Sequence, residues 1–383
     1  MYNFSYYNPT RIVFGQGRIA EISQHIPANA RVLITYGGKS AEKYGTLAEV
    51  RQALGERYVV EFGGIEANPH YETLMKATQL AKENHVDYLL AVGGGSVVDG
   101  TKFIAAAYYH ENVWDHWVNK TPITQALPMG CVMTLPATGS EMNATSVVSH
   151  IASGAKVGFN HPLLFPQFAV LDPEKSYTLP ARQVANGVVD AFVHVIEQYL
   201  TFPVYGKVQD RFAEGLLLTL LEEGPKALTQ PENYDVRATL TWCATLALNG
   251  LIGAGVPQDW ATHRIGHQLT SLYGLDHAQT LAVLLPSLLY VQRNNKHEKL
   301  LQYATRIWQI TEGDDETRIS QAIAKTRDFF EHMGIKTRMR DYGLPPDAVE
   351  AIIHNLKVFN LLPQGERQDI DEVMAREILT LSY

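Results

Sequence analysis

The residues most suited to chemistry form two pairs, each spaced by four positions. Asp190 and His194 stand in DAFVHVIE, and His263 and His267 stand in ATHRIGHQL. If both segments are helical, each pair projects from one face of its helix. Taken singly, such a pair is more often a surface contact or a satisfied core residue than a functional group.

A further histidine makes a metal site the better interpretation. His277 follows ten residues after His267, so that three of the 14 histidines fall within 15 residues, all in an apolar and Gly-rich context. One carboxylate and three imidazoles would make a four-ligand site for a divalent transition ion. Nitrogen ligands suit zinc or ferrous iron better than magnesium.

A second constellation is the glycine run in AVGGGSVVDGTK, residues 91–102. Glycines between a strand and a helix let the backbone approach a phosphate, and the free N–H groups of the helix start attract negative charge. We therefore expect a ligand that carries a diphosphate. The common dinucleotide fingerprint would need glycine at Val98, and the triphosphate loop would need Gly-Lys-Ser/Thr at positions 100–102. A Gly-rich turn with only a packing role is the alternative.

The end of the first predicted strand bears on the choice of cofactor. The stretch from Tyr36 to Ser40 holds no acid that would bind a ribose 2'-hydroxyl and repel a 2'-phosphate. Lys39 and Ser40 instead offer a cation and a hydroxyl. If the ligand is a nicotinamide cofactor, NADP(H) is favoured over NAD(H). A merely solvated Lys39 is an equal alternative.

Alternating strands and helices predict the scaffold that positions these residues. Strands are expected at 31–36, 58–62, 87–92, 129–136 and 168–172. Helices between them imply a mostly parallel sheet covered on both faces. After residue 180 about nine helical segments follow, without a convincing strand. We predict an α/β plus all-α protein, with a Rossmann-like cofactor-binding domain over 1–180, a helical metal-binding and substrate domain over 181–383, and the metal site in the cleft between them.

Composition narrows the possible partners and the compartment. The net charge is −8 and Lys and Arg are scattered, so nucleic acid and anionic membranes are not expected partners. Cys131 and Cys243 stand far apart, which predicts neither a disulfide framework nor a thiolate metal site. The segment MYNFSYYNPTRIVFG lacks a signal-peptide pattern, and no apolar stretch is long enough to span a bilayer. We expect a cytoplasmic protein.

The run AVLDPEKSYTLPARQVANGVVDAFVHVIE, residues 169–197, resembles the first signature of the iron-containing (group III) alcohol dehydrogenases. The acid, proline and glycine positions of that signature are matched by Asp172, Pro180, Gly187, Asp190 and Glu197. GGGSVVDGTK and TLPATGSE (134–141) are similar to the family's cofactor loop and its nicotinamide-side loop. The resemblance covers essentially the whole chain and is greatest to the branch of NADPH-dependent aldehyde reductases and butanol dehydrogenases.

The resemblance implies roles for individual residues. It implies metal ligation by Asp190, His194, His263 and His277, with His267 beside the metal as a catalytic residue that faces nicotinamide and substrate. It gives Asp99 a catalytic and cofactor-binding place near the ribose and nicotinamide half. The other implied cofactor contacts are Gly37, Gly38 and Ser40 around the 2'-phosphate, Gly93, Gly94, Gly95 and Ser96 at the pyrophosphate, Thr134, Thr138 and Ser140 along the cofactor, and Lys156 at its ribose.

Two further positions modify this assignment. Many members of the family have Pro-His-Gly around the last ligand, whereas this chain has Asp276, His277 and Ala278. Such flanking residues set the orientation of a ligand and the shape of the pocket. Glu197 shares the face of Asp190 two turns along, and we expect it to support the site or the helix packing rather than to bind metal.

Together these residues predict a metal-dependent, NADPH-linked alcohol dehydrogenase or aldehyde reductase. Iron(II) or zinc would polarise a carbonyl oxygen as hydride arrives from the nicotinamide, and His267 or a cofactor-ribose relay would supply the proton. The loop 143–146, with Leu251 and Trp260, offers small or uncharged side chains. Short, uncharged aldehydes and alcohols with broad specificity are therefore the expected substrates.

Two other functions are weighed against this one. A non-redox lyase resembling dehydroquinate synthase could use the same scaffold, but the chain lacks an acid near Gly38 and a Lys/Arg cluster around the histidines. A non-catalytic metal- or nucleotide-binding protein would leave Lys156, His267 and both cofactor loops without a role. The resemblance further implies a homodimer, to which NFSYYNPTRIVFG could contribute an edge strand.

Overall fold

Six parallel strands form the sheet that the sequence predicts for the first half. The computed structural model describes residues 1–383. Its main strands are β1 (Arg11–Phe14), β2 (Arg31–Tyr36), β3 (Tyr58–Phe62), β4 (Tyr88–Gly94), β5 (Met129–Leu135) and β8 (Phe168–Leu171). The helices among them are α1 (Ser40–Lys43), α2 (Thr46–Leu54), α3 (Tyr71–Glu83), α4 (Gly95–Ala107) and α5 (Val113–Asn119). The five predicted strands are confirmed, and β1, which lies within the segment expected to supply an edge strand, extends the sheet beyond them.

The strand order explains where a ligand is expected on this sheet. The order is β1-β8-β5-β4-β2-β3, and every neighbouring pair is parallel. β2 pairs with β3 on one side and with β4 on the other, so the order of strands reverses between β2 and β4. The carboxyl ends of strands at such a switch point form the usual ligand crevice of an open parallel sheet.

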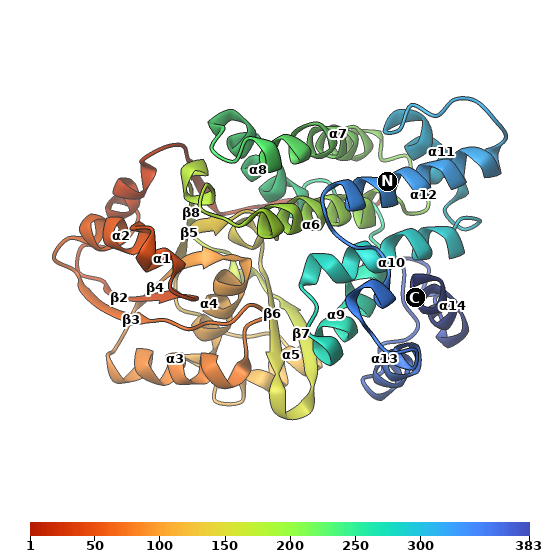
Figure 1. Ribbon diagram of the computed structural model, residues 1–383. Coiled ribbons are helices and arrows are strands. Elements are labelled where there is room, and N and C mark those ends of the chain that lie inside the picture. The colour runs from red at the N-terminus through yellow and green to blue at the C-terminus, as the bar shows by residue number, and fades with distance from the viewer. The chain divides into compact units, whose positions relative to one another are not determined.

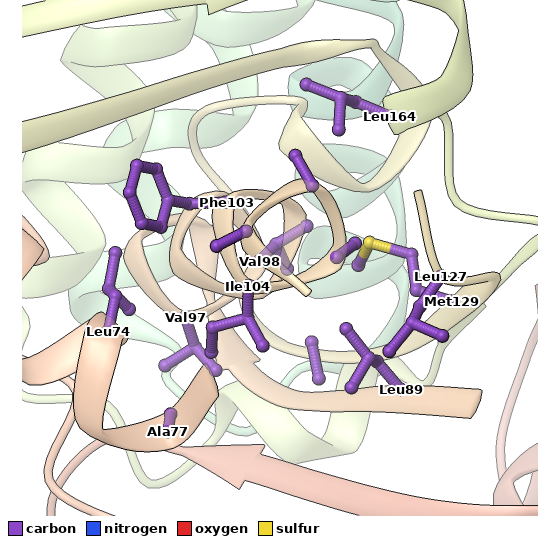
Figure 2. Packing of buried hydrophobic residues seen from close by; sticks show 14 of the residues in the cluster. Leu74, Ala77, Leu89, Val97, Val98, Phe103, Ile104, Leu127, Met129 and Leu164 are labelled. Carbon is purple, nitrogen blue, oxygen red and sulfur yellow. The ribbon is translucent and has the colours of Figure 1, made fainter. Parts of the chain in front are cut away.

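Each strand sends alternate side chains to opposite faces, because side chains in a strand alternate with period two. Leu89 and Cys131 join a hydrophobic cluster with α3 and α4, whereas their neighbours Leu90 and Val132 join a second cluster with α2. Figure 1 shows α3 and α4 covering one face, and Figure 2 shows the first cluster around Leu89 and Ile104. Complete burial of such an aliphatic side chain contributes about 1.5–3 kcal/mol. The predicted covering of both faces is confirmed.

An antiparallel hairpin is the element that the sequence did not indicate. β6 (Thr145–His150) pairs with β7 (Ala155–Asn160), and the turn between them contains Gly154 with φ 68°. The expectation of a loop over 143–146 is therefore wrong for its last two residues, which begin β6. The reason is local: TSVVSH contains two adjacent valines, and β-branched residues fit a pleated surface.

Nine α-helices follow Pro180, as predicted. They are α6 (Ala181–Tyr199), α7 (Lys207–Thr229), α8 (Tyr234–Ala247), α9 (Ala261–Tyr273), α10 (His277–Val291), α11 (His297–Arg306), α12 (Asp315–His332), α13 (Ala348–Val358) and α14 (Glu372–Ser382). α6 is buried on all sides from Gly187 onward, which explains its nearly continuous apolar sequence. None of the helices has the length and apolar character required to cross a membrane.

Contacts group the chain into two units. The α/β unit comprises Tyr7–Leu179 and Pro231–Thr245, and the helical unit comprises Met1–Tyr6, Pro180–Gln230 and Leu246–Tyr383. Most of α8 thus packs with the sheet, although it is flanked in sequence by helices of the other unit. A functional division of the chain at residue 180 stays a prediction.

Candidate metal centre and cofactor loops

Four side chains from three helices converge in the helical unit. Asp190 and His194 lie on α6, His263 on α9 and His277 at the first position of α10, and one ligand atom of each lies within 4.8 Å of the others. We call these four residues the metal cluster. The spacing of four along α6 places its two members on one face, and α9 and α10 supply the rest.

Close packing of α9 on α10 brings the histidines together. A Cβ built on Gly266 would lie 2.7 Å from Oγ1 of Thr280, so only glycine permits this approach between the two helices. Gly266 follows His263 by one turn of α9, and Thr280 follows His277 by one turn of α10. The glycine therefore sets the separation of the two imidazoles.

The distances within the metal cluster suit a bound cation. Nε2 of His194, His263 and His277 lies 3.6, 3.9 and 3.5 Å from Oδ1 of Asp190. A tetrahedral ion with metal–ligand distances near 2.1 Å holds neighbouring ligand atoms about 3.4 Å apart. Oδ1 of Asp190 and Nε2 of His263 are buried and make no hydrogen bond within the protein. Orphaned buried atoms are costly unless something binds them, and the donor set fits a divalent transition ion.

Burial and neighbouring charge set the protonation of these groups. Burial lowers the pKa of His194 to about 4, against the opposing effect of Asp190. Burial acts to raise the pKa of Asp190, but the surrounding histidines outweigh it and hold that pKa well below its usual range. Burial also acts to lower the pKa of His263, yet the carboxylates of Glu197 and Asp190 raise it to about 9. An ionised Asp190 and a neutral His194 are the forms that bind metal.

Glu197 supports the cluster from behind, as the sequence led us to expect. Its Oε2 contacts Nδ1 of His263, and its Oε1 accepts a hydrogen bond of 2.6 Å from the backbone N–H of Thr262. The side chain of Glu197 is only 2% exposed. A carboxylate on the far nitrogen of a ligand histidine fixes the tautomer and the orientation of the ring.

Two aromatic residues border the metal cluster. His267 follows His263 by one turn of α9, and its ring centre lies 5.6 Å from that of His277. The ring of Trp260 lies 5.3 Å from that of His263 and 6.2 Å from that of His194. His267 therefore lies beside the metal cluster, and Trp260 lies beside the rings of His194 and His263, whereas a catalytic role for His267 stays a prediction.

The predicted cofactor residues gather at the carboxyl ends of neighbouring strands in the α/β unit. Gly93 and Gly94 end β4, Gly95 begins α4, and a Cβ on Gly95 would collide with Oγ1 of Thr138 at 2.1 Å. Gly37 follows β2, where a Cβ would lie 3.5 Å from Val97. Thr134 lies near the end of β5. Three predicted cofactor segments thus meet at the switch point of the sheet, where free backbone N–H groups begin a helix.

The segment predicted to receive a 2'-phosphate is open to solvent. Gly38, Lys39 and Ser40 are all exposed, and no atom lies within 4 Å of a Cβ built on Gly38. Ser40 begins the short helix α1. The chain offers a hydroxyl and a cation here and no carboxylate, as the sequence indicated.

Asp99 and Ser140 occupy a different environment from the other predicted cofactor residues. Oγ of Ser140 donates a hydrogen bond of 2.5 Å to Oδ1 of Asp99, and the backbone N–H of Val147 donates one of 3.0 Å to Oδ2. Nζ of buried Lys102 donates to Oγ of Ser140 at 2.9 Å and to Oδ1 of Asn143 at 3.1 Å. We call Asp99, Lys102, Ser140 and Asn143 the Lys102 cluster. Their side chains bind one another, so a direct role at the cofactor stays a prediction for Asp99 and Ser140.

Asn68 is a residue of this region that the sequence reasoning missed. Its Oδ1 accepts a hydrogen bond of 2.7 Å from Nζ of Lys156, and its backbone N–H donates one of 3.2 Å to Oγ of Ser96. It therefore links two predicted cofactor residues. The Asn-Pro dipeptide at 68–69 signals a turn, and Asn68 has φ 60°, a conformation that asparagine tolerates. That signal locates the turn but not its partners.

Comparison with known proteins identifies the family of the chain. The sequence model of the iron-containing alcohol dehydrogenase family matches residues 9–173. The sequence model of the family's C-terminal part matches residues 184–376. The NADPH-dependent aldehyde reductase YqhD of Escherichia coli is 58% identical over 383 residues, which is 99% of each chain. NADP-dependent alcohol dehydrogenase 3 of Entamoeba histolytica is 38% identical over 392 residues, which is 100% of each chain.

Solved structures show the same relationship. A crystal structure of Escherichia coli YqhD superimposes with a TM-score of 0.98 at 57% identity, covering 100% of this chain and 99% of that one. The structure of NADH-dependent butanol dehydrogenase A from Thermotoga maritima gives a TM-score of 0.95 at 33% identity, covering 100% and 99% of the two chains. The chain therefore belongs to the iron-containing alcohol dehydrogenase family.

Proposed function

We propose that the protein is a metal-dependent, NADPH-linked aldehyde reductase that also works in the reverse direction as an alcohol dehydrogenase. The observation that carries the proposal is the metal cluster, in which one carboxylate and three imidazoles converge while Oδ1 of Asp190 and Nε2 of His263 make no hydrogen bond. Family membership and the relatives named as NADPH- or NADP-dependent enzymes support it.

Asp190, His194, His263 and His277 would hold one divalent ion, iron(II) or zinc. Such an ion supplies Lewis-acid polarisation of a carbonyl oxygen, which stabilises the negative charge that develops as hydride is added. The chain's own part is to keep Asp190 ionised and to orient His263 through Glu197, with the ring of Trp260 lying against that of His263. His267 is our candidate for delivering a proton from its imidazole to the product oxygen.

NADPH is the proposed hydride donor. The glycine segment 93–95 at the start of α4 supports a diphosphate, and the exposed stretch Gly38–Ser40 has room and no carboxylate to repel a 2'-phosphate. Lys156, held by Asn68, is proposed to contact the ribose. The proposed substrates are short, uncharged aldehydes and alcohols with broad specificity, because Leu251 and Trp260, which the sequence assigns to the substrate pocket, carry no charge.

The comparisons and the site geometry favour neither a non-redox lyase nor a non-catalytic binding protein. The relatives described above are all named as reductases or dehydrogenases, so nothing favours a non-redox lyase. A non-catalytic binding protein would need neither the half-buried His267 beside the metal cluster nor the convergent glycine segments.

Metal analysis of the purified protein, combined with NADPH and NADH oxidation over linear, branched and hydroxylated aldehydes, tests the proposal. We expect one divalent transition ion per chain and faster oxidation of NADPH than of NADH. Asp190→Ala should abolish both metal and turnover, and an Asp190→Ala protein that keeps both would overturn the assignment. His267→Ala should keep the metal and lose turnover, and full turnover would remove His267 from proton delivery.

We further propose a homodimer in the cytoplasm. β1 lies at the edge of the sheet and pairs only with β8, so its other side offers unpaired backbone groups to a second copy. Sedimentation equilibrium tests whether this edge forms the dimer. The wild type should sediment as a dimer and Ile12→Pro as a monomer.

A further inference from the structure

The residue before His277 is bound to the helix that carries Asp190. Nδ2 of Asn186 donates a hydrogen bond of 2.8 Å to Oδ2 of Asp276. Asn186 lies on α6 one turn before Asp190, and Asp276 immediately precedes the first residue of α10. The bond therefore joins the turn before one proposed ligand to the residue before another.

The backbone of Asp276 is fixed from the other side by α10 itself. Its N–H donates a hydrogen bond of 3.0 Å to Oε1 of Gln279, and its carbonyl oxygen accepts one of 3.2 Å from the N–H of Thr280. Oγ1 of Thr280 also donates a hydrogen bond of 2.7 Å to the carbonyl of His277. With its backbone held in this way, Asp276 transmits the position of α6 to the start of α10.

His277 is the member of the metal cluster that most needs such support. Its side chain is 25% exposed, compared with 4% for Asp190, 5% for His194 and 9% for His263. The three other ligands are almost fully enclosed by core atoms, whereas a quarter of the His277 side chain faces solvent. Hydrogen-bonded partners behind a ligand commonly change metal affinity by 10- to 100-fold when removed.

We propose that Asn186 and Asp276 form a clasp that positions His277 against Asp190 and thereby sets how tightly the metal cluster holds a divalent transition ion. Both are positioning residues, since neither offers an atom to the ion. The inference rests on the proposed metal site. The carboxylate also places negative charge at the start of α10, which favours both the helix and a nearby cation.

Zinc affinity of the metal-free protein, measured by competition with a chromophoric chelator, is the test. Asn186→Ala and Asp276→Ala should each weaken zinc binding about tenfold, and the double variant should lose no more than either single one, because residues acting as one unit are not additive. Wild-type affinity in both single variants, or losses that add in the double variant, would overturn the clasp. Asn186→Ala is safe for folding, because alanine is the best helix former.

Two matched variants separate the hydrogen bond from charge and from general destabilisation. Asp276→Asn keeps an acceptor oxygen of the same size, and it should bind zinc more tightly than Asp276→Ala. Arg182 lies 3.4 Å from the same Oδ2, but its side chain is 66% exposed, so Arg182→Ala should bind zinc like the wild type. An Arg182→Ala protein weakened as much as Asp276→Ala would attribute the effect to surface charge and overturn the clasp.

The visible spectrum of the cobalt(II)-substituted protein gives a readout that a purely structural role does not change, because it reports the geometry of the ligands. The cobalt bands should shift in Asn186→Ala and Asp276→Ala and stay in place in Arg182→Ala. An unchanged spectrum in both clasp variants would also overturn the inference. A wild-type protein that binds neither zinc nor cobalt would instead overturn the proposed function, so the two failures are distinguishable.

Discussion

The metal cluster and the Lys102 cluster are both buried and both centred on an aspartate, but their atoms are paired differently. Nζ of Lys102 donates hydrogen bonds to two side chains and two backbone carbonyls, and both oxygens of Asp99 accept bonds from the protein. Oδ1 of Asp190 and Nε2 of His263 have no such partner. Buried polar groups that satisfy one another stabilise a fold, whereas orphaned ones indicate a missing ligand.

This difference weakens the sequence-based assignment of Asp99 and Ser140 to the cofactor site. Asp99 and Ser140 looked equivalent to the other cofactor residues, yet their side chains are engaged with Lys102 and Val147. Burial lowers the pKa of Lys102 to about 8, although Asp99 opposes that effect. We interpret the Lys102 cluster as the support that holds the segment 138–146 on α4. We therefore expect substitutions in the metal cluster to reduce activity and substitutions in the Lys102 cluster to reduce stability.

His194→Ala should produce the largest effect, and on function alone. Removing one of four ligands should reduce the metal content to background and lower turnover by about a thousandfold or more, since the ion supplies several kcal/mol of charge stabilisation. The free energy of unfolding of the metal-free protein should change little, because Nδ1 of His194 has no hydrogen bond to lose. Metal analysis, aldehyde reduction and urea unfolding measure the three quantities.

The matched control for that experiment is His297→Ala in the same unit. The side chain of His297 is 47% exposed, and the substitution is chemically identical. It should leave metal, turnover and stability unchanged. If the metal-free His194→Ala protein proves much less stable than the metal-free wild type, the metal cluster contributes to the fold by itself and the contrast with the Lys102 cluster fails.

Lys102→Met should produce the opposite pattern. Removing Nζ leaves its buried acceptors on Ser140, Asn143 and Thr145 without their donor, which costs about 1–3 kcal/mol. The free energy of unfolding should fall by that amount, whereas the metal content of the protein that remains folded should stay at one ion per chain. Lys226→Met, at a lysine whose side chain is 50% exposed, should shift the free energy of unfolding by less than about 0.5 kcal/mol. Equal stability of the two variants would refute the assigned role of Lys102.

The two clusters also show how far the sequence could be interpreted. The spacing of Asp190 and His194 predicted a shared helical face, because the α-helix has a fixed period. The three histidines within 15 residues indicated a metal site, but only the family resemblance selected His263 and His277, rather than His267, as its ligands. For Lys102 the family resemblance gave no role either. Its partners begin 38 residues away at Ser140, and burial that depends on such distant contacts leaves no local pattern.

The strands show the same limit. β2, β3, β4, β5 and β8 were predicted as strands, and β1 lies within the segment from which an edge strand was expected, whereas β6 and β7 of the hairpin mix polar with apolar residues. Their strand structure depends on pairing with neighbours rather than on burial. Sequence therefore predicted the elements whose apolar pattern is continuous, and the structure was needed for the rest.

Gly38→Asp tests the other part of the α/β unit, where the predicted cofactor residues Gly38–Ser40 are exposed, unlike the buried Asp99. The position is exposed and a Cβ meets no atom within 4 Å, so the new carboxylate fits and should repel a 2'-phosphate. kcat/KM for NADPH should fall about 10- to 100-fold, equivalent to about 1.4–2.7 kcal/mol. Activity with NADH should change little.

Gly38→Asn is the control, since it adds a side chain of the same size without charge. It should keep most of the NADPH activity, and a loss as large as that of Gly38→Asp would show that bulk rather than charge matters. Unchanged NADPH activity in Gly38→Asp would remove this segment from the 2'-phosphate site.

A third buried cluster tests whether paired charges act through stability in the helical unit too. Nζ of Lys296 lies 2.6 Å from Oδ2 of Asp259 and 2.8 Å from Oε2 of Glu366, and all three side chains are at most 4% exposed. Burial raises the pKa of Glu366 from 4.5 to about 7, despite the opposing effect of Lys296. Between pH 4.5 and 7, Glu366 therefore keeps its proton in the folded protein but has released it in the unfolded chain.

The free energy of unfolding should consequently fall as pH rises from 4.5 to 7 and level off above that range, since an acid whose pKa is raised by folding stabilises the fold only while it is protonated. The fall should be on the order of 2 kcal/mol. Glu366→Gln cannot ionise and should remove this fall, so urea unfolding at pH 5 and pH 8 should differ less in the variant. Glu316→Gln alters a carboxylate that is 60% exposed and should keep the wild-type pH dependence. If Glu366→Gln also keeps it, the third cluster does not bind the extra proton, and its charges are compensated as fully as those around Lys102.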